Sequence, residues 1–313
     1  MILSDYVNTF GQAMKSKHGE RVHKISLNAN LTCPNRDGSK GIGGCTFCNV
    51  ASFNPDARNS KNIQQQILAG KNVIRKRTGA KKYLAYFQAY TNTYGDIEQL
   101  KAIYDQALSE KDIIGLSIGT RPDCVPESVI KLLVEYQNQG YEIWLELGLQ
   151  SAFDQTLNKV NRGHGYAEYI QAVRLANKYG IKVCTHLIIG LPDEDNYHYE
   201  TTLSRVLDEG VAGLKLHPLH VVKGTQLAKD YLHNRYTPIT LDEYINSVAN
   251  LIELTPEEVI YHRVTGTASS DILLAPQWCS KKWQVINRIT KELHNRKLVK
   301  NLSTKNGTDS LCA

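Results

Sequence analysis

The chain has 313 residues and a formal net charge of +6, with 42% hydrophobic and 22% charged residues. This composition excludes an intrinsically disordered or collagen-like chain, because it supplies enough apolar surface for a large core. No run of eighteen or more apolar residues occurs, so no membrane-spanning helix is expected. The N-terminus lacks the basic and apolar regions of a signal peptide, and we therefore expect a cytoplasmic protein.

Short apolar segments alternate with amphipathic segments along the first 220 residues, which is typical of parallel βαβ units. The expected strands are residues 24–31, 83–88, 113–118, 142–148, 182–189 and 213–217. The expected helices are residues 61–77, 97–109, 126–139, 166–179 and 197–209. Several of these helices end just before a glycine, which suits a left-handed C-terminal cap.

Six strands are too few for a closed eight-stranded barrel. They predict a partial (β/α)6 TIM-like barrel, with a doubly wound parallel sheet as the alternative, and both place functional loops at the carboxyl ends of strands. Beyond residue 237 the pattern changes to a helix (241–254), a short strand (259–263) and a helix (281–296). We expect residues 1–235, with an N-terminal helix, to form the barrel. Residues 236–313 are expected to form a C-terminal α/β extension packed on it as part of a single structural unit.

The segment after the first expected strand carries three of the seven cysteines, Cys33, Cys45 and Cys48. In a reducing compartment such a group is more typical of metal binding or catalysis than of disulfides. A structural zinc ion needs four ligands. The candidates for the fourth are a distant cysteine, His18, His23 and Asp37. A C-x-x-C redox pair would leave Cys33 unused, whereas a [4Fe–4S] cluster held by three thiolates leaves one iron open for another ligand.

The cysteine segment resembles that of the radical SAM superfamily, whose members usually carry C-x3-C-x2-C after the first strand of a partial barrel. The pair Cys45-Thr-Phe-Cys48 fits this pattern, although eleven residues separate Cys33 from Cys45. Further segments are similar to the Elongator catalytic subunit and to coproporphyrinogen-oxidase-like enzymes. They are Gly119-Thr-Arg-Pro-Asp123, Glu146-Leu-Gly-Leu-Gln150-Ser with Arg162-Gly-His164, Gly190-Leu-Pro192, Lys215-Leu-His-Pro with Gly224-Thr225, Arg263-Val-Thr-Gly-Thr and Ala275-Pro-Gln-Trp. The strongest likeness is to bacterial Elongator-like proteins of the YtqA/YhcC (MnmL) type.

This resemblance implies that Cys33, Cys45 and Cys48 hold a [4Fe–4S] cluster whose open iron binds S-adenosyl-L-methionine. It also implies which residues contact that cofactor: Phe47 near the adenine, Gln88 in the segment that meets the methionine amino group, and the polar pair Gln150 and Arg162. Gly119 stands where the family has an acidic residue that contacts the cofactor. Reduction of the cluster by a protein such as flavodoxin or ferredoxin would yield a 5′-deoxyadenosyl radical that abstracts hydrogen from the substrate.

The MnmL likeness implies a tRNA substrate, whose wobble 5-carboxymethylaminomethyl-uridine is converted to 5-aminomethyl-uridine. About eighty residues follow the expected barrel, too few for the acetyltransferase domain of the Elongator subunit. Basic residues suit a tRNA partner, because eight Lys or Arg and two acidic residues lie between Lys281 and the C-terminus, and a second basic run spans Lys71–Lys82. Two other interpretations stay open: a radical SAM enzyme acting on a small metabolite or peptide, and a zinc-stabilised nucleic-acid-binding module.

Several other polar residues near strand ends have no assigned role, and the residue that contacts the substrate is left unassigned. They are Tyr90, Tyr94, His164, His186, His217 and His220, each expected to be an ordinary core or surface group. Three of the remaining cysteines are expected to be small buried residues, Cys124, Cys184 and Cys279, and Cys312 lies in a polar tail. In the Cys33–Cys45 loop, glycines allow tight turns, and the polar residues either solvate the loop or face the substrate: Asn35, Arg36, Asp37 and Lys40.

Overall fold

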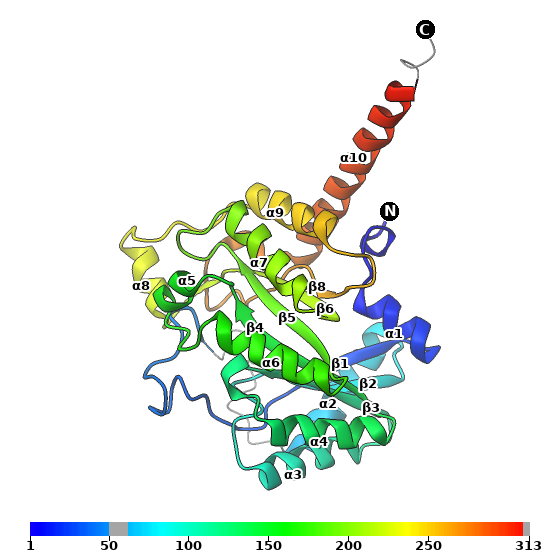
Figure 1. Cartoon of the computed structure of the whole chain (residues 1–313), viewed down its shortest axis with the longest axis vertical. Coiled ribbons are helices and arrows are strands. Elements are labelled where there is room, and N and C mark those ends of the chain that lie inside the picture. The colour runs from blue at the N-terminus through cyan, green and yellow to red at the C-terminus, as the bar shows by residue number, and fades with distance from the viewer. Residues whose placement is uncertain (50–61, 309–313) are drawn as a thin grey trace.

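A computed structural model describes residues 1–49 and 62–308, with side chains up to residue 299. The main sheet of this part of the chain contains seven parallel strands in the order β1-β2-β3-β4-β5-β6-β8 (Figure 1). These strands are β1 (Val22–Leu27), β2 (Lys82–Phe87), β3 (Ile113–Thr120), β4 (Glu142–Gln150), β5 (Lys182–Ile189), β6 (Gly213–Pro218) and β8 (Ile260–Arg263). A separate antiparallel pair is formed by β7 (Val221–Val222) and β9 (Leu273–Ala275).

Helices follow most strands of the sheet and cover its outer face (Figure 1). The α-helices are α1 (Phe10–His18), α2 (Ile63–Thr78), α3 (Ile97–Leu108), α4 (Glu127–Asn138), α5 (Asp154–Lys159), α6 (Tyr166–Lys178), α7 (Asn196–Asp208), α8 (Gln226–Leu232), α9 (Leu241–Leu254) and α10 (Lys282–Thr308). The short 3-10 helices are η1 (Leu3–Asp5), η3 (Pro122–Cys124) and η4 (Gln277–Ser280). In Figure 1, α10 projects away from the body of the molecule.

The strand order confirms the partial barrel and rules out the doubly wound alternative. Each strand from β1 to β6 pairs in parallel with the next strand of the sequence, whereas a doubly wound sheet reverses its order at a switch point. The sheet has one strand more than the six that we predicted, because β8 pairs in parallel with β6 through Gly213 and Ile260. The strand expected at 259–263 therefore joins the barrel sheet and leaves β1 and β8 as its two edges.

Apolar side chains fill the outer layer of the barrel, and polar side chains fill much of its interior. Strand β4 is buried along nearly its whole length, as expected for a parallel strand covered on both faces. Residues such as Leu116 and Leu145 pack beneath the helices in the main core. The N-terminal helix α1 packs with Trp144 through Phe10 and Met14, and Thr9 bridges to Tyr261 of the β8 edge. Helix α1 therefore covers the end of the barrel interior near Trp144.

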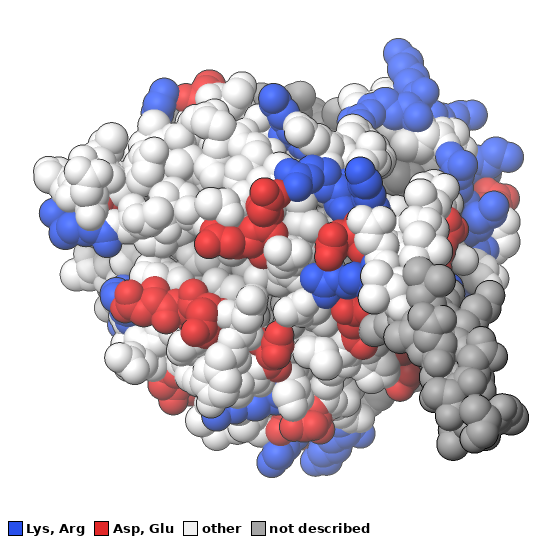
Figure 2. All heavy atoms as spheres, turned by 90° about the horizontal axis from the view of Figure 1, so that it is seen from above, with Lys and Arg blue, Asp and Glu red and all other residues white. Residues whose placement is uncertain are grey.

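The short elements are the ones that the sequence pattern missed. Helices α5 and α8 and the β7–β9 pair span seven residues or fewer, too few for an apolar periodicity to appear. Helix α10 continues beyond the predicted end at residue 296. Among the described residues, no helix combines the length and apolar character that crossing a membrane requires. On the face seen in Figure 2, Lys and Arg gather at the upper right, and acidic side chains lie across the middle.

Candidate active site

A cavity of about 240 Å³ lies at the carboxyl ends of the strands and reaches into the barrel interior. Its walls include all seven residues that the sequence singled out for the cluster and the cofactor: Cys33, Cys45, Phe47, Cys48, Gln88, Gln150 and Arg162. These residues come from the loops after β1, β2 and α5 and from the last residue of β4. The carboxyl ends of parallel strands meet at the same end of a barrel, which is why positions so far apart in the sequence share one cavity.

The Cys45–Cys48 turn is fixed by backbone hydrogen bonds to two other parts of the chain. Within the turn, the Cys48 amide donates to the Cys45 carbonyl at 3.0 Å. The Thr46 amide donates to the Val160 carbonyl at 3.0 Å, and the Leu227 amide of α8 donates to the Thr46 carbonyl at 2.8 Å. The turn is thus held between the end of α5 and the start of α8, so these two short helices position the cysteines.

The eleven-residue gap between Cys33 and Cys45 folds around the buried side chain of Asn35, which is 1% exposed. The Asn35 carbonyl accepts from the Gly44 amide at 2.8 Å, and its Nδ2 donates to the Asn161 carbonyl at 2.6 Å and lies 3.7 Å from the Cys45 sulfur. A β-carbon at Gly41 would collide with Asn35 Oδ1. Gly44 has a φ of +82°, a conformation that favours glycine. Asn35 therefore organises the loop rather than facing solvent.

Two cations of the loop also have structural partners. Arg36 lines the cavity, and its Nη2 donates to the Cys48 carbonyl at 2.6 Å. Lys40 forms an ion pair with Asp123 at 2.7 Å. Asp37 forms a local turn with Ser39. Of the four polar loop residues that sequence reasoning left open, only Arg36 therefore reaches the cavity wall.

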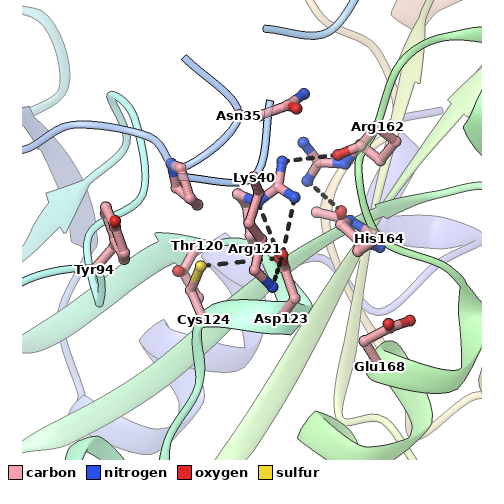
Figure 3. Close-up of polar contacts among 12 residues, drawn as sticks. Asn35, Lys40, Tyr94, Thr120, Arg121, Asp123, Cys124, Arg162, His164 and Glu168 are labelled. Carbon is pink, nitrogen blue, oxygen red and sulfur yellow. Dashed lines mark hydrogen bonds and ion pairs between the residues drawn. The ribbon is translucent and has the colours of Figure 1, made fainter. Parts of the chain in front are cut away.

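Arg162 lies against the cysteines at the centre of a chain of hydrogen bonds. Its Nη1 donates to the Cys45 sulfur at 3.4 Å and its Nη2 to the Gly148 carbonyl at 2.6 Å, while its buried Nε has no partner among the described residues. Arg121 donates to the Arg162 carbonyl at 2.8 Å and holds Asp123 through two bonds of 2.9 and 3.0 Å (Figure 3). The Arg162 guanidinium therefore places a positive charge beside the Cys45 sulfur.

Gln150 has a backbone conformation that is rare for its residue type, with a φ of +81°. The β4–β5 pairing shifts register between Gly148 and Gln150, and such a bulge turns a side chain toward a site. A β-carbon at Gly148 would lie 2.8 Å from Gln150 Nε2 and 2.9 Å from Arg162 Nη2. Strained conformations of this kind gather at functional sites, so the glycine and the bulge together place Gln150 and Arg162 side by side.

Gly119, which the resemblance implies replaces an acidic residue, lies in the wall of the cavity. A β-carbon at Gly119 would lie 3.0 Å from the Phe87 carbonyl oxygen, tighter than an ordinary contact. The Gly119 carbonyl accepts from the Asn92 amide at 3.2 Å and from Asn92 Nδ2 at 2.8 Å. This part of the cavity wall is therefore formed by backbone and is supported by the loop after β2.

Burial raises the pKa of two thiols in and near this site, those of Cys48 and Cys124. Burial raises the pKa of Cys48, with a further rise from Cys45, and the nearby Arg36 opposes the shift. Burial raises the pKa of Cys124 to about 12. Cys124 does not line the cavity, and together with the buried Cys184 and Cys279 it matches the predicted role of a small buried residue.

Beneath the cysteines the cavity ends on a buried charged network that sequence reasoning did not assign. Glu146 is 0% exposed and contacts the ammonium groups of Lys24 and Lys215 and the hydroxyl of Ser117. His186 Nε2 lies 2.7 Å from Glu146, and Lys215 Nζ donates to the Tyr86 hydroxyl at 2.9 Å. Burial opposes ionisation of Glu146, but the two ammonium groups lower its pKa well below the ordinary value. The network fixes a carboxylate and two lysines inside the barrel.

The unassigned residues near strand ends divide into two groups. Four line the cavity: Tyr90, His186, His217 and His220. The other two, Tyr94 and His164, are not among the residues that line it. The Tyr94 hydroxyl donates to the Ser39 hydroxyl at 3.0 Å, and His164 lies near Arg162 (Figure 3). Arg121, which also lines the cavity, sits in the quoted Gly119–Asp123 segment. Arg121 and Asp123 are only two residues apart, so the sequence could have indicated an ion pair between them, but the sequence analysis did not use this spacing.

The Asp123 contacts predict a pH dependence of stability. Burial raises the pKa of Asp123, but hydrogen bonds from Arg121 and Lys40 outweigh it and lower the pKa to about 2. A pKa that is lower in the folded state contributes stability above the unfolded value near 4, and this stability is lost as pH falls toward 2. In urea unfolding of the apoprotein, we expect Asp123→Asn to cost about 2 kcal/mol at pH 6. The gap between the two proteins should close toward pH 2, and an equal gap at both pH values would contradict this.

The parallel partial barrel and the cysteine-lined cavity at the carboxyl ends of its strands are those of enzymes that use an iron–sulfur cluster and S-adenosylmethionine to make radicals. The Radical SAM superfamily pattern matches residues 33–206, and the Radical_SAM C-terminal domain pattern matches residues 211–295. The chain belongs to the radical SAM superfamily, whose members use a [4Fe–4S] cluster and S-adenosyl-L-methionine.

Individual relatives refine this assignment. The chain is 49% identical over 283 residues to Protein YhcC of Escherichia coli (strain K12), covering 90% of this chain and 91% of that protein. It is 32% identical over 174 residues to the tRNA uridine(34) acetyltransferase of Dehalococcoides mccartyi, covering 54% of this chain and 36% of that protein. The solved structure of Methanocaldococcus infernus Elp3 has the same fold, with a TM-score of 0.65 and 18% identity over 88% of this chain and 63% of that one. The predicted likeness to Elongator-like proteins of the YhcC type is confirmed.

Proposed function

We propose that this radical SAM enzyme modifies the wobble uridine of tRNA by converting 5-carboxymethylaminomethyl-uridine to 5-aminomethyl-uridine. The observation that carries the substrate class is the similarity, over more than half of this chain, to a protein named for tRNA uridine(34). The particular reaction is the one that the likeness to the MnmL type implies. A flavodoxin or ferredoxin is the proposed reductant.

The cavity residues fit this chemistry. Cys33, Cys45 and Cys48 would hold the cluster, and the Arg162 guanidinium beside Cys45 offsets the negative charge of the thiolates. Phe47 packs on the apolar cluster that includes Val160 and Leu227 while it lines the cavity, a position suited to an adenine ring. When bound, the cluster and S-adenosylmethionine supply a 5′-deoxyadenosyl radical. The protein's part is to hold both groups in the cavity inside the barrel and to limit the access of water to the radical.

In the two basic segments, Lys71–Lys82 and the C-terminal helix α10, some cations pair with acidic residues and others do not. In α10, Arg288 pairs with Asp242 and Arg296 pairs with Glu253 and Glu292. Lys71 of α2 lies within reach of Glu110 and Asp112. In the described part of the chain no ion pair or side-chain hydrogen bond involves the exposed residues Arg75, Lys76, Arg77, Lys81, Lys281 and Lys282. These six cations are therefore available to a phosphate backbone.

Arg77 and Lys282 belong to one surface, although they are far apart in the sequence. Burial lowers the pKa of His23 of β1, and the charges of Arg21, Arg77 and Lys282 lower it further. The three cations thus gather beside the free edge β1 of the sheet. Trp283, which is 68% exposed, lies next to Lys282, and an exposed aromatic ring among cations suits a stacked nucleotide base. We propose this surface, defined by Arg21, Arg77, Lys282 and Trp283, as the basic edge that contacts tRNA.

Replacing two cations of the basic edge is expected to weaken tRNA binding. In Arg77→Gln/Lys282→Gln, two phosphate contacts are lost, so affinity should fall roughly tenfold and the slope of log affinity against log salt should fall by about 1.5. The matched control is Lys101→Gln/Lys131→Gln, which removes two exposed lysines paired with acids on α3 and α4. Filter binding between 50 and 300 mM salt measures both. Equal slopes for the two double variants would count against the basic edge.

The nucleosides of a deletion strain test the proposed reaction. We expect mass spectrometry of bulk tRNA to show accumulation of 5-carboxymethylaminomethyl-uridine and loss of the nucleosides derived from 5-aminomethyl-uridine. Complementation with the wild-type gene should restore the profile. An unchanged profile in the deletion strain would rule out the tRNA reaction and leave a small metabolite or peptide as the substrate class.

A further inference from the structure

The ring of Tyr90 marks the place where the cavity meets solvent. Tyr90 lies in the loop after β2 and lines the cavity. It is 36% exposed, and every other described residue of the cavity wall is more buried than this. The rest of the wall therefore belongs to the interior of the barrel, whereas Tyr90 lies at its mouth.

The backbone of Tyr90 has a left-handed conformation that a bulky residue seldom adopts, with a φ of +65°. In the described part of the chain six non-glycine residues have a positive φ, and four of them are Asn or Asp, the types that tolerate it best. The other two are Tyr90 and Gln150, and both line the cavity. Because strained backbone of this kind gathers at functional sites, the strain at Tyr90 points to a function in this cavity.

The residues that follow Tyr90 hold it in this conformation. The Thr91 amide donates to the Thr32 carbonyl at 3.2 Å. Asn92 is 0% exposed and donates to the Gly119 carbonyl through its amide at 3.2 Å and through Nδ2 at 2.8 Å. The loop is thus anchored to the segments after β1 and within β3, and the ring of Tyr90 is positioned before any ligand arrives.

Contacts within the protein do not explain why a tyrosine is kept at this strained position. In the described part of the chain the Tyr90 hydroxyl makes no hydrogen bond, and the ring belongs to none of the apolar clusters there. The next residue, Thr91, is 0% exposed and lines the cavity, and its hydroxyl is buried without a partner among the described residues. Buried polar groups normally have partners, so this part of the wall suits a ligand with polar groups.

The proposed substrate supplies a group that suits the ring. A uridine whose 5-substituent reacts inside a barrel has to leave the stack of its neighbours. The stacking contacts that it loses are commonly replaced by an aromatic side chain. Phe47, which is more buried than Tyr90, is the ring assigned to the adenine of the cofactor. Tyr90, at the mouth, is therefore available to the base that enters from outside.

We propose that Tyr90 is the platform on which the wobble base of the tRNA stacks while its 5-substituent reaches into the cavity. This inference rests on the proposed tRNA reaction and names a residue that holds the substrate. Stacking is tolerant of the identity of the base, so Tyr90 positions the nucleotide and does not select uridine. The ring, and not the hydroxyl, carries this role.

The test compares two synthetic anticodon stem–loop RNAs bound by the reconstituted full-length enzyme. One has uridine at the wobble position and the other is abasic there, so backbone contacts cancel in the ratio of their dissociation constants. A stack between a base and an aromatic ring corresponds to a roughly 5- to 150-fold change. We expect wild type and Tyr90→Phe to prefer the uridine RNA at least about fivefold, and Tyr90→Ala to show a ratio near one. A wild-type ratio of one would overturn the platform.

A second pair of variants separates the ring from the backbone. Tyr90→Gly and Tyr90→Ala both lack the ring, but only glycine adopts the left-handed conformation without strain. The melting temperature of Tyr90→Gly should therefore exceed that of Tyr90→Ala, whereas both variants should have a ratio near one. If either variant kept the wild-type preference, the ring would not be the platform.

Controls separate the platform from the cofactor site and from the reaction. Tyr197→Ala removes a tyrosine of α7 that is 67% exposed and does not line the cavity, and it should keep the wild-type ratio. Tyr90→Ala should bind S-adenosylmethionine as wild type does in equilibrium dialysis. Weaker cofactor binding with an unchanged RNA ratio would assign the ring to the cofactor and overturn the proposal. An unchanged ratio beside the expected nucleoside profile of the deletion strain would overturn the platform and leave the reaction standing.

Discussion

Replacing Cys45 with alanine is expected to abolish S-adenosylmethionine cleavage. The three cysteines at the cavity are the only ones in the described ranges that line it, so no spare thiolate can take over. Cys45 is also the cysteine that Arg162 and Asn35 contact, so its loss removes the anchor of the loop as well as a ligand. Mutation of a residue that only supports a metal ligand lowers metal affinity or activity roughly 10- to 100-fold. Loss of a ligand should therefore cost at least roughly 1,000-fold.

The measurement is formation of 5′-deoxyadenosine under reducing, anaerobic conditions. Wild type should purify as a brown protein with about four iron and four sulfide per chain, whereas Cys45→Ala should be colourless. The matched control is Cys279→Ala, which removes a buried cysteine of another apolar cluster; its cleavage rate should match that of wild type. Cleavage by Cys45→Ala at the wild-type rate would remove the role of the cysteines. A colourless wild type with one zinc would contradict the cluster itself.

The sequence was sufficient to predict the fold, and the residues it proposed for the cluster and the cofactor share one cavity, for reasons visible in particular residues. The parallel strands are apolar because helices and interior residues cover both faces, and their ends carry the segments that meet in the cavity. Gln150 is an example, since it lies just beyond the predicted strand 142–148. Arg162 follows the short helix α5, which the pattern missed, so only the resemblance singled it out. Cys33, Cys45 and Cys48 share the cavity for the same reason.

The lower part of the site depends on contacts that no local pattern encodes. Glu146 meets Lys24 across 122 residues and Lys215 across 69 residues of sequence. A single sequence shows three charged residues in three strands but gives no reason to pair them. The sequence also offered no explanation for the length of the Cys33–Cys45 gap, because that gap folds around the contact of Asn35 with Asn161. Polar contacts between residues far apart in the sequence could therefore not be predicted from the sequence alone.

Neutralising Glu146 is expected to cause the largest loss of stability of any single charge change in this barrel. The Glu146 side chain is 0% exposed, and those of Lys24 and Lys215 are 14% and 3% exposed. Removing one member of a buried ion pair leaves the partner charge uncompensated, which costs about 3–5 kcal/mol. Glu146→Gln leaves the two ammonium groups of Lys24 and Lys215 without a carboxylate. We therefore expect a loss of about 3–5 kcal/mol in urea unfolding of the apoprotein at pH 7.

Two further variants show that the uncompensated charge is the cause. Asp242→Asn breaks the exposed pair with Arg288 and should cost less than about 1 kcal/mol, because surface ion pairs contribute little. Adding Lys215→Met to Glu146→Gln removes one stranded cation while keeping a similar volume. The double variant should therefore be more stable than Glu146→Gln alone by at least about 1 kcal/mol. If Glu146→Gln costs no more than Asp242→Asn, the interior of the barrel is better hydrated than these contacts imply.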